Sequence, residues 1–255
     1  MKRKILLAIA MLGFLFLTAD FAMAYTPDGN LSDWGAINPN SAQWTPNAGI
    51  FYTVNPPVGN GGYVGPGWGG QLFHVDALYV TADNTNLYLA LITGFPNTAG
   101  GVLYGGSYYS AGDIAIDFGA NGTWDYGIEI GDHKAGYGGY NGTPGHIYTG
   151  ITWQADTSWG GVSSPLYMLT AATDAGTANG FAYNNTFYGN NHWVIELSIP
   201  KTYFGSDWNE YGIVHWTMSC GNDNINVTTT PEPMSMALLG GGLFALLGSR
   251  LRRRK

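Results

Sequence analysis

The sequence predicts an all-β protein: an antiparallel β-sandwich of jelly-roll type, flanked by an N-terminal signal helix and a C-terminal single transmembrane helix. Three observations lead to this fold class. Several short segments alternate between apolar and polar residues, which is the period of a half-buried strand. Loops rich in Gly and Asn separate these segments, where helical periodicity is hard to find. Apolar stretches beside basic clusters occupy both ends of the chain of 255 residues.

The first 24 residues have the three parts of a secretory signal peptide. Basic residues at positions 2–4 precede thirteen almost wholly apolar residues, Ile5 to Leu17, and positions 22–24 read Ala-Met-Ala. A bilayer span needs about 20 residues, so this stretch is short for a permanent anchor. We therefore expect export and a mature chain that begins at Tyr25.

Residues 231–255 repeat this pattern in the opposite order. A Pro-Glu-Pro triplet precedes sixteen mainly apolar residues, and a basic cluster ends the chain. The charged members of this cluster are Arg250, Arg252, Arg253, Arg254 and Lys255. Snorkelling of Arg250 and local thinning of the bilayer allow so short a span. Because a basic cluster after an apolar helix stays in the cytoplasm, the body of the chain is expected outside.

The triplet Pro231-Glu232-Pro233, the short glycine-containing apolar segment and the Arg-rich terminus together resemble the PEP-CTERM sorting signal. The resemblance covers residues 231–255. It implies that an exosortase-type membrane protease recognises Pro231, Glu232 and Pro233 and removes the tail. The protein would then be membrane-anchored before processing, and on the cell surface or extracellular afterwards. An ordinary C-terminal anchor is the alternative, but it gives no reason for the triplet.

Residues 25–230 form one stretch of 206 residues, which is enough for a single β-sandwich domain with a real core. Two lysines and fifteen acidic residues give this body a net charge of −13. Such a surface repels phosphate backbones, so a nucleic-acid partner is not expected, whereas calcium or a neutral polysaccharide suits it better. Cys220 is the single cysteine and is expected to be a small buried hydrophobe on a late strand, with an intermolecular bridge as the alternative.

The strands are assigned from the alternation and from the turn residues between them. The expected strands are 73–81 and 87–93, the hairpin 113–118 with 124–130, then 193–199, and 211–219 as the last strand. In the hairpin, a three-residue loop at 121–123 keeps the apolar residues of both strands on one face. This register pairs Phe118 with Tyr126 and Ile116 with Ile128.

The same register gathers acidic residues on the opposite face of the hairpin. Glu129 would lie across from Ala115, with Asp113 and Asp117 as diagonal neighbours. Three interpretations stay open: a solvated acidic face, a calcium site, or a catalytic acid/base pair. No nucleophile elbow, zinc-protease helix, P-loop or dinucleotide fingerprint is present in the sequence.

Aromatic residues are abundant, with 9 Trp, 17 Tyr and 11 Phe in the chain. Sugar rings stack on exposed aromatic faces. Trp68, Trp153 and Trp159 lie in or near glycine-rich loops and are the candidate glycan platform. Packing of these side chains in the core or the loops is the alternative for each of them.

Three segments of the body resemble the family-nine sugar-binding sandwich group and its DOMON-like relatives: TPDGNLSDWG, LFHVDALYVTADNTNLYLALITGFP and HWVIELSIPKTYFG. The entry pattern of this group is matched by Asp28, Gly29, Leu31 and Trp34, and its late hydrophobic-Pro pair by Ile199 and Pro200. The resemblance implies a sandwich fold. If such sandwiches bind structural calcium, Asp76, Asn222 and Asp223 join the hairpin acids as candidate ligands.

These observations lead to an expected function. The chain is expected to be a non-enzymatic envelope or extracellular-matrix protein, processed through its C-terminal sorting signal, with glycan or Ca²⁺ as candidate ligands. The alternative is a secreted glycan-active hydrolase that uses the carboxylates of the acidic hairpin.

Overall fold

The structure is a computed structural model that describes residues 25–131, 139–189 and 191–230. The expected signal peptide (1–24) and sorting tail (231–255) lie outside these residues. Within the described part of the chain, no helix is long and apolar enough to cross a membrane.

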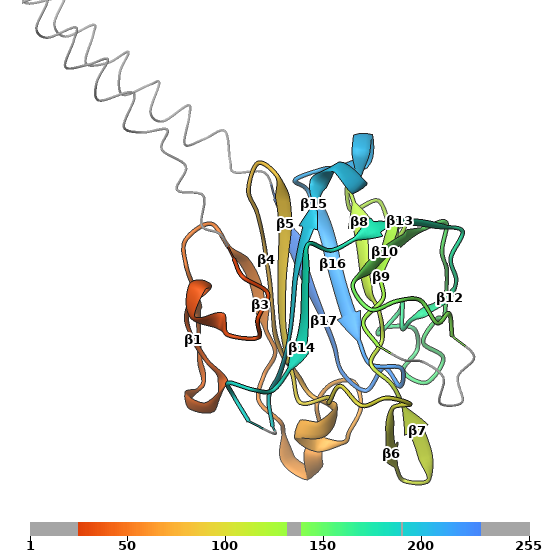
Figure 1. Ribbon diagram of the computed structural model, residues 1–255. Coiled ribbons are helices and arrows are strands. Elements are labelled where there is room, and N and C mark those ends of the chain that lie inside the picture. The colour runs from red at the N-terminus through yellow and green to blue at the C-terminus, as the bar shows by residue number, and fades with distance from the viewer. Residues whose placement is uncertain (1–24, 132–138, 190, 231–255) are drawn as a thin grey trace, which may run out of the picture.

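Two antiparallel sheets pack face to face, which confirms the predicted all-β sandwich (Figure 1). The five-stranded sheet has the order β14-β15-β5-β4-β3, and the six-stranded sheet has the order β13-β10-β9-β8-β16-β17. Three two-stranded hairpins, β1–β2, β6–β7 and β11–β12, accompany them. The chain passes between the sheets after β5, after β13 and after β15. On its returns, β15 pairs with the earlier β5 and β16 pairs with the earlier β8.

The strands of the five-stranded sheet are β3 (Phe51–Val54), β4 (Val75–Ala82), β5 (Asn86–Thr93), β14 (Gly180–Asn184) and β15 (Trp193–Pro200). Those of the six-stranded sheet are β8 (Ile114–Phe118), β9 (Tyr126–Ile128), β10 (His146–Thr149), β13 (Thr173–Thr177), β16 (Gly212–Thr217) and β17 (Asn224–Thr229). The hairpins are β1 (Gly35–Asn38) with β2 (Gln43–Pro46), β6 (Val102–Tyr104) with β7 (Ser107–Tyr109), and β11 (Thr152–Trp153) with β12 (Met168–Thr170). The short 3-10 helices are η2 (Leu31–Asp33), η3 (Pro39–Ser41), η4 (Asn60–Gly62), η5 (Gly70–Phe73), η6 (Lys201–Tyr203) and η7 (Gly205–Asp207).

The core lies between the two sheets and follows the predicted alternation. Leu89 and Leu91 of β5 belong to one buried cluster with Ile116 of β8 and with Val214 and Trp216 of β16. Each such side chain contributes roughly 1.5–3 kcal/mol when it is fully removed from water. The intervening residues of β5 point to the other face, as the period of two requires.

A second apolar cluster covers the outer face of the five-stranded sheet. Leu31 and Trp34 of the N-terminal segment are buried there. Beside them, the buried carboxylate of Glu196 on β15 accepts hydrogen bonds from the Trp34 indole N–H (2.7 Å) and the Gly29 backbone N–H (2.6 Å). The residues that match the pattern Asp-Gly-x-Leu-x-x-Trp thus hold the N-terminal segment against this face of the sheet.

The predicted hairpin 113–130 forms with the predicted faces, but the predicted register is wrong. Ile116 pairs with Tyr126, which is two residues away from the expected partner. The loop between the strands is longer because the Asp117 carboxylate accepts the backbone N–H groups of Asn121 and Gly122. Carboxylate acceptors of this kind stabilise a wider turn. Gly122 has the predicted left-handed conformation (φ +86°).

The prediction that the segment 211–219 is the last strand is also wrong. This segment forms β16, and β17 follows it and pairs with it along its whole length. Ile225 and Val227 of β17 point into the core, but the strand is otherwise polar. Two apolar residues in a segment of Asn and Thr gave a weak strand signal.

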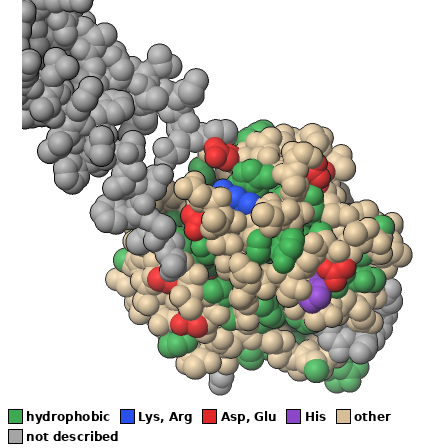
Figure 2. All heavy atoms as spheres, turned by 45° about the horizontal axis from the view of Figure 1, so that its top comes forward, with side chains coloured by type: hydrophobic (Ala, Val, Ile, Leu, Met, Phe, Trp, Pro, Cys, Tyr) green, Lys and Arg blue, Asp and Glu red, His purple; other side chains and the backbone are tan. Residues whose placement is uncertain are grey.

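The two ends of the sandwich differ in structure. We call the end formed by residues 55–74, 94–112, 185–192 and 219–223 the loop end, at the bottom of Figure 1. The opposite tail end carries the β4–β5 turn, residues 119–125, and Thr230. Figure 2 turns the tail end toward the viewer and shows one basic side chain and several separate acidic side chains on that side. Tyr25 lines the same tail-end pocket as Thr230, so both ends of the described body meet there.

The buried Glu196 should make the folding stability depend on pH. Burial raises the pKa of Glu196 to about 8, against the opposing effect of its hydrogen bonds from Gly29 and Trp34. Between its unfolded value of 4.5 and about 8, the folded protein keeps a proton that the unfolded chain has lost. The free energy of unfolding should therefore fall as pH rises through this window, by up to about 1.4 kcal/mol per pH unit. Urea denaturation at pH 5, 6.5 and 8 measures it.

Glu196→Gln should remove this part of the slope, because an amide does not titrate in this range. Glu210→Gln, at an exposed glutamate, is the control and should keep the slope of the original chain. Equal slopes in the original chain and Glu196→Gln would contradict the assignment.

Candidate functional site

Most of the exposed large apolar side chains of the described chain lie at the loop end. Six of the nine lie within its segments: Tyr63, Trp68, Leu103, Tyr104, Tyr108 and Phe187. A seventh, Val162, lies on the loop between β11 and β12 that also carries Trp159. The other two, Tyr52 and Tyr211, lie elsewhere. Apolar side chains gathered on one face indicate a surface that contacts something other than water. The loop end is therefore the candidate functional site.

Three aromatic rings form a connected group at this end, which we call the aromatic cluster: Tyr63, Trp68 and Trp159. The ring centroids of Tyr63 and Trp68 are 5.3 Å apart, and those of Trp68 and Trp159 are 6.0 Å apart. Trp68 is 53% exposed and Tyr63 is 44% exposed. The fold thus brings together two of the three tryptophans that the sequence predicted as a glycan platform.

Trp153, the third predicted platform residue, does not join this cluster. It lies on β11, pairs with Met168 of β12, and packs beside Gly127. Its indole nitrogen is buried and has no hydrogen-bond partner within the described residues. This tryptophan is partly buried beside Gly127 and lies apart from the aromatic cluster.

The β16–β17 turn holds the aromatic cluster in place. The Trp159 indole N–H donates to the Cys220 carbonyl oxygen (3.1 Å), and the Asn222 side-chain amide donates to the Trp68 carbonyl oxygen. The Gly67 backbone N–H donates to the Asn222 carbonyl oxygen (2.6 Å). A Cβ at Gly67 would lie 2.8 Å from the Trp159 ring and 2.9 Å from Asn222 Cα, so only glycine permits this approach.

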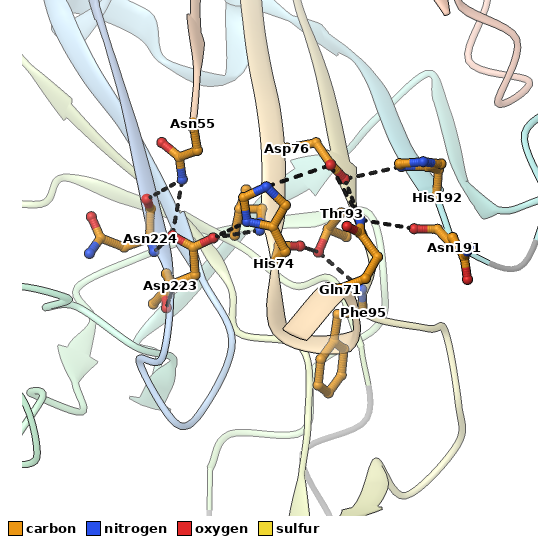
Figure 3. A network of polar contacts seen from close by, with 12 residues as sticks. Asn55, Gln71, His74, Asp76, Thr93, Phe95, Asn191, His192, Asp223 and Asn224 are labelled. Atoms are coloured by element: carbon orange, nitrogen blue, oxygen red, sulfur yellow. Dashed lines mark hydrogen bonds and ion pairs between the residues drawn. The ribbon is translucent and has the colours of Figure 1, made fainter. Parts of the chain in front are cut away.

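A buried polar network lies beside the cluster and is centred on Asp223 (Figure 3). The Asp223 carboxylate lies 2.8 Å from Nδ1 of His74 and accepts the backbone N–H of Val75 at 2.7 Å. Its other oxygen accepts the Asn55 side-chain amide (3.0 Å) and the Asn224 backbone N–H (2.9 Å). Asp223 is 1% exposed, and this burial raises its pKa while the hydrogen bonds from His74 and Val75 lower it. Four donors therefore surround a carboxylate that has no open path to solvent.

The network continues on the other side of the His74 ring. Nε2 of His74 lies 3.7 Å from Asp76, whose carboxylate accepts the Gln71 amide and lies 3.3 Å from Nδ1 of His192. Asp76 and His74 are buried, and His192 comes from the loop before β15. The network thus links the start of β4, the residue before β17 and the loop before β15 beneath the loop end.

The predicted calcium residues Asp76, Asn222 and Asp223 all lie at the loop end, but they have different partners. Asp76 and Asp223 flank His74 on opposite sides, and Asn222 holds Trp68. Within the described ranges, no group of three or more His, Cys, Asp or Glu side chains is arranged to hold a metal ion.

The hairpin acids Asp113, Asp117 and Glu129 are buried, so the expectation of a solvated acidic face is wrong. Asp113 accepts the backbone N–H groups of Met168 (2.8 Å) and Ile130 (3.3 Å). Asp117 accepts from its own turn, and Glu129 accepts the Gly142 N–H (3.1 Å). Each carboxylate thus satisfies backbone donors of a nearby loop, which favours a structural role.

Sequence reasoning missed Tyr63, His74 and His192 as parts of this end. No sequence motif marks these histidines, because their partners lie far away in sequence, 149 residues in the case of His74 and Asp223. The one local signal was the spacing of His74 and Asp76, two residues apart at the start of β4.

The fold and the loop end define a class of protein: an antiparallel β-sandwich that presents an aromatic surface cluster on hydrogen-bonded loops. Comparison of the chain with protein-family models, with curated proteins and with solved structures found no match.

Removal of the central carboxylate should destabilise the fold. Asp223→Ala leaves the buried donors of His74, Val75 and Asn224 without their acceptor, and we expect a loss of about 3 kcal/mol or more in the free energy of unfolding. The matched control is Asp174→Ala, which removes the 2.7 Å His146–Asp174 contact at the surface. This control should cost less than about 0.5 kcal/mol, because exposed pairs contribute little. Similar losses in both variants, measured by urea denaturation, would contradict the central role of Asp223.

Proposed function

We propose that the protein is a non-enzymatic exported glycan-binding protein whose aromatic cluster binds a neutral polysaccharide. The observation that carries the proposal is the half-exposed ring of Trp68, fixed beside Tyr63 and Trp159 at one end of the sandwich. A sugar ring has apolar C–H faces that pack on an exposed aromatic ring, while its hydroxyl groups need polar partners at the rim. Asn222 and the backbone of the glycine-rich loop at 65–70 supply such polar groups.

The charge of the body favours a neutral ligand over an acidic one. The body carries a net charge of −13, and Lys201 is the only Lys or Arg among its described residues. Lys201 lies at the tail end, so no described lysine or arginine stands beside the aromatic cluster. Uronic acids and phosphate groups would be repelled there unless a cation bridged them.

The export and sorting steps are part of the same proposal. The secretory signal and the PEP-CTERM tail would carry the body across the membrane and hold it there until an exosortase-type protease acts. Tyr25 and Thr230 both lie at the tail end, so a chain tethered there would hold the loop end away from the membrane. We also propose that the sandwich has a jelly-roll topology and that it is related to the family-nine sugar-binding sandwiches.

Calcium binding stays a prediction that thermal unfolding can test. A rise of the unfolding midpoint with calcium that Asp117→Asn and Glu129→Gln abolish would support a hairpin site. An unchanged midpoint would contradict it. The buried hairpin carboxylates, bound to backbone N–H groups, are the reason that we propose a binding protein and not the hydrolase.

Trp68→Ala should lower the affinity for a neutral polysaccharide at least about tenfold, because the variant loses the exposed ring face. Isothermal titration with soluble β-glucan, xylan and galactomannan measures this change. Tyr211→Ala removes another exposed aromatic side chain, 38% exposed and at the tail end, and should bind like the original chain.

Two results would contradict the site assignment. The first is a Trp68→Ala variant that binds as tightly as the original chain. The second is loss of binding in Tyr52→Ala instead, since Tyr52 and Trp44 line a separate shallow depression of about 550 Å³ beside β3.

A further inference from the structure

A pocket of about 880 Å³ opens at the tail end of the sandwich. Its floor includes Phe51, Val80 and Phe118, which are inner-face residues from both sheets. Lys201 and Trp208 stand on its rim, and Thr230 lines it as well. The apolar interior of the sandwich therefore approaches the surface where the described chain ends.

We propose that this tail-end pocket is the docking site of the segment Pro231-Glu232-Pro233 of the same chain. The first argument is position. Thr230 already lines the pocket, and an extended chain advances about 3.3–3.6 Å per residue. Two residues of extended chain span at most about 7 Å, which is enough to bring Glu232 to the rim of the pocket.

The second argument is charge complementarity. Lys201 is the only Lys or Arg of the described residues, and Glu232 is the only acidic residue of residues 231–255. The ammonium of Lys201 lies 4.2 Å from the centre of the Trp208 ring, and no described carboxylate is within ion-pair distance of it. Burial lowers the pKa of Lys201, and the charges of Glu210 and Asp83, which line the same pocket beyond ion-pair distance, oppose this effect. A carboxylate that approaches Lys201 directly would compensate its partial burial.

The third argument is the chemistry of the proline residues. Proline has no backbone N–H, so Pro231 and Pro233 can enter an apolar pocket with only their carbonyl groups left to satisfy. Their rings suit a wall that contains Trp208. Figure 2 shows the blue side chain of the tail end next to hydrophobic side chains, with acidic side chains around them. A Pro-Glu-Pro segment matches this arrangement of one cation and apolar neighbours.

Docking would regulate the sorting step, and this consequence rests on the proposed function. A tripeptide that lies in the pocket is withheld from a membrane protease and becomes available only when it leaves. The binding of the segment itself does not depend on the protease, so the two proposals can fail separately.

The test is the titration of Glu232 in the full chain, purified in detergent micelles with ¹³C-labelled glutamate. The chain has four glutamates, and Glu232→Gln assigns the relevant NMR signal. We expect Glu232 to titrate about 0.5–1 unit below its ordinary pKa of about 4.3. In Lys201→Met, which keeps an apolar stem on Trp208, the pKa should return to the ordinary value. Glu210→Gln should keep it low.

A Glu232 carboxyl that titrates at its ordinary pKa in both proteins would overturn the docking proposal. Failure of the sorting proposal would show differently, as an uncleaved tail on the original chain in cells, with the lowered pKa of Glu232 unchanged.

Discussion

The hydrogen bonds of one buried carboxylate, Asp223, hold the two sheets together at the loop end. Asp223 precedes β17 of the six-stranded sheet, while its partners His74 and Val75 lie at the start of β4 in the five-stranded sheet. Asn55, which follows β3, completes the link. A buried carboxylate is costly without donors, so this position is stable only while all of these strand ends stay in register. The geometry of the surrounding loops follows from that requirement.

The aromatic cluster depends on the same turn. Cys220 and Asn222, which lie in the same β16–β17 turn as Asp223, bind Trp159 and the loop that carries Trp68. The exposed rings are thus fixed by hydrogen bonds to a turn that is itself locked into the core. Fixed rings lose little conformational freedom when a ligand packs on them, which is the usual advantage of a preformed binding surface. Interactions far apart in sequence therefore combine into one rigid platform.

Alternation alone predicted the strands with strong apolar faces, such as β5 and β15, and also which face of the 113–130 hairpin is buried. It could not predict the register, because a shift of two residues keeps every side chain on the same face. The side chain of Asp117 decided that register through its turn. For the site, Trp68 and Trp159 stood out as loop tryptophans, whereas their proximity and the roles of Tyr63 and His74 arise from contacts across the fold. Sequence composition cannot show such contacts.

The two ends of the sandwich differ in chemistry because the chain places different constraints on them. At the loop end, long glycine-rich segments leave the sheets, so buried polar groups such as Asp223 must satisfy the backbone there, and aromatic rings remain outside. At the tail end, short turns cover less of the interior, and the inner faces of both sheets reach a pocket whose rim holds Lys201. Both ends of the described body also meet there. The proposed ligand site and the proposed tether would therefore lie at opposite ends, and a polymer bound at Trp68 would leave the tail-end pocket accessible to the chain that follows Thr230.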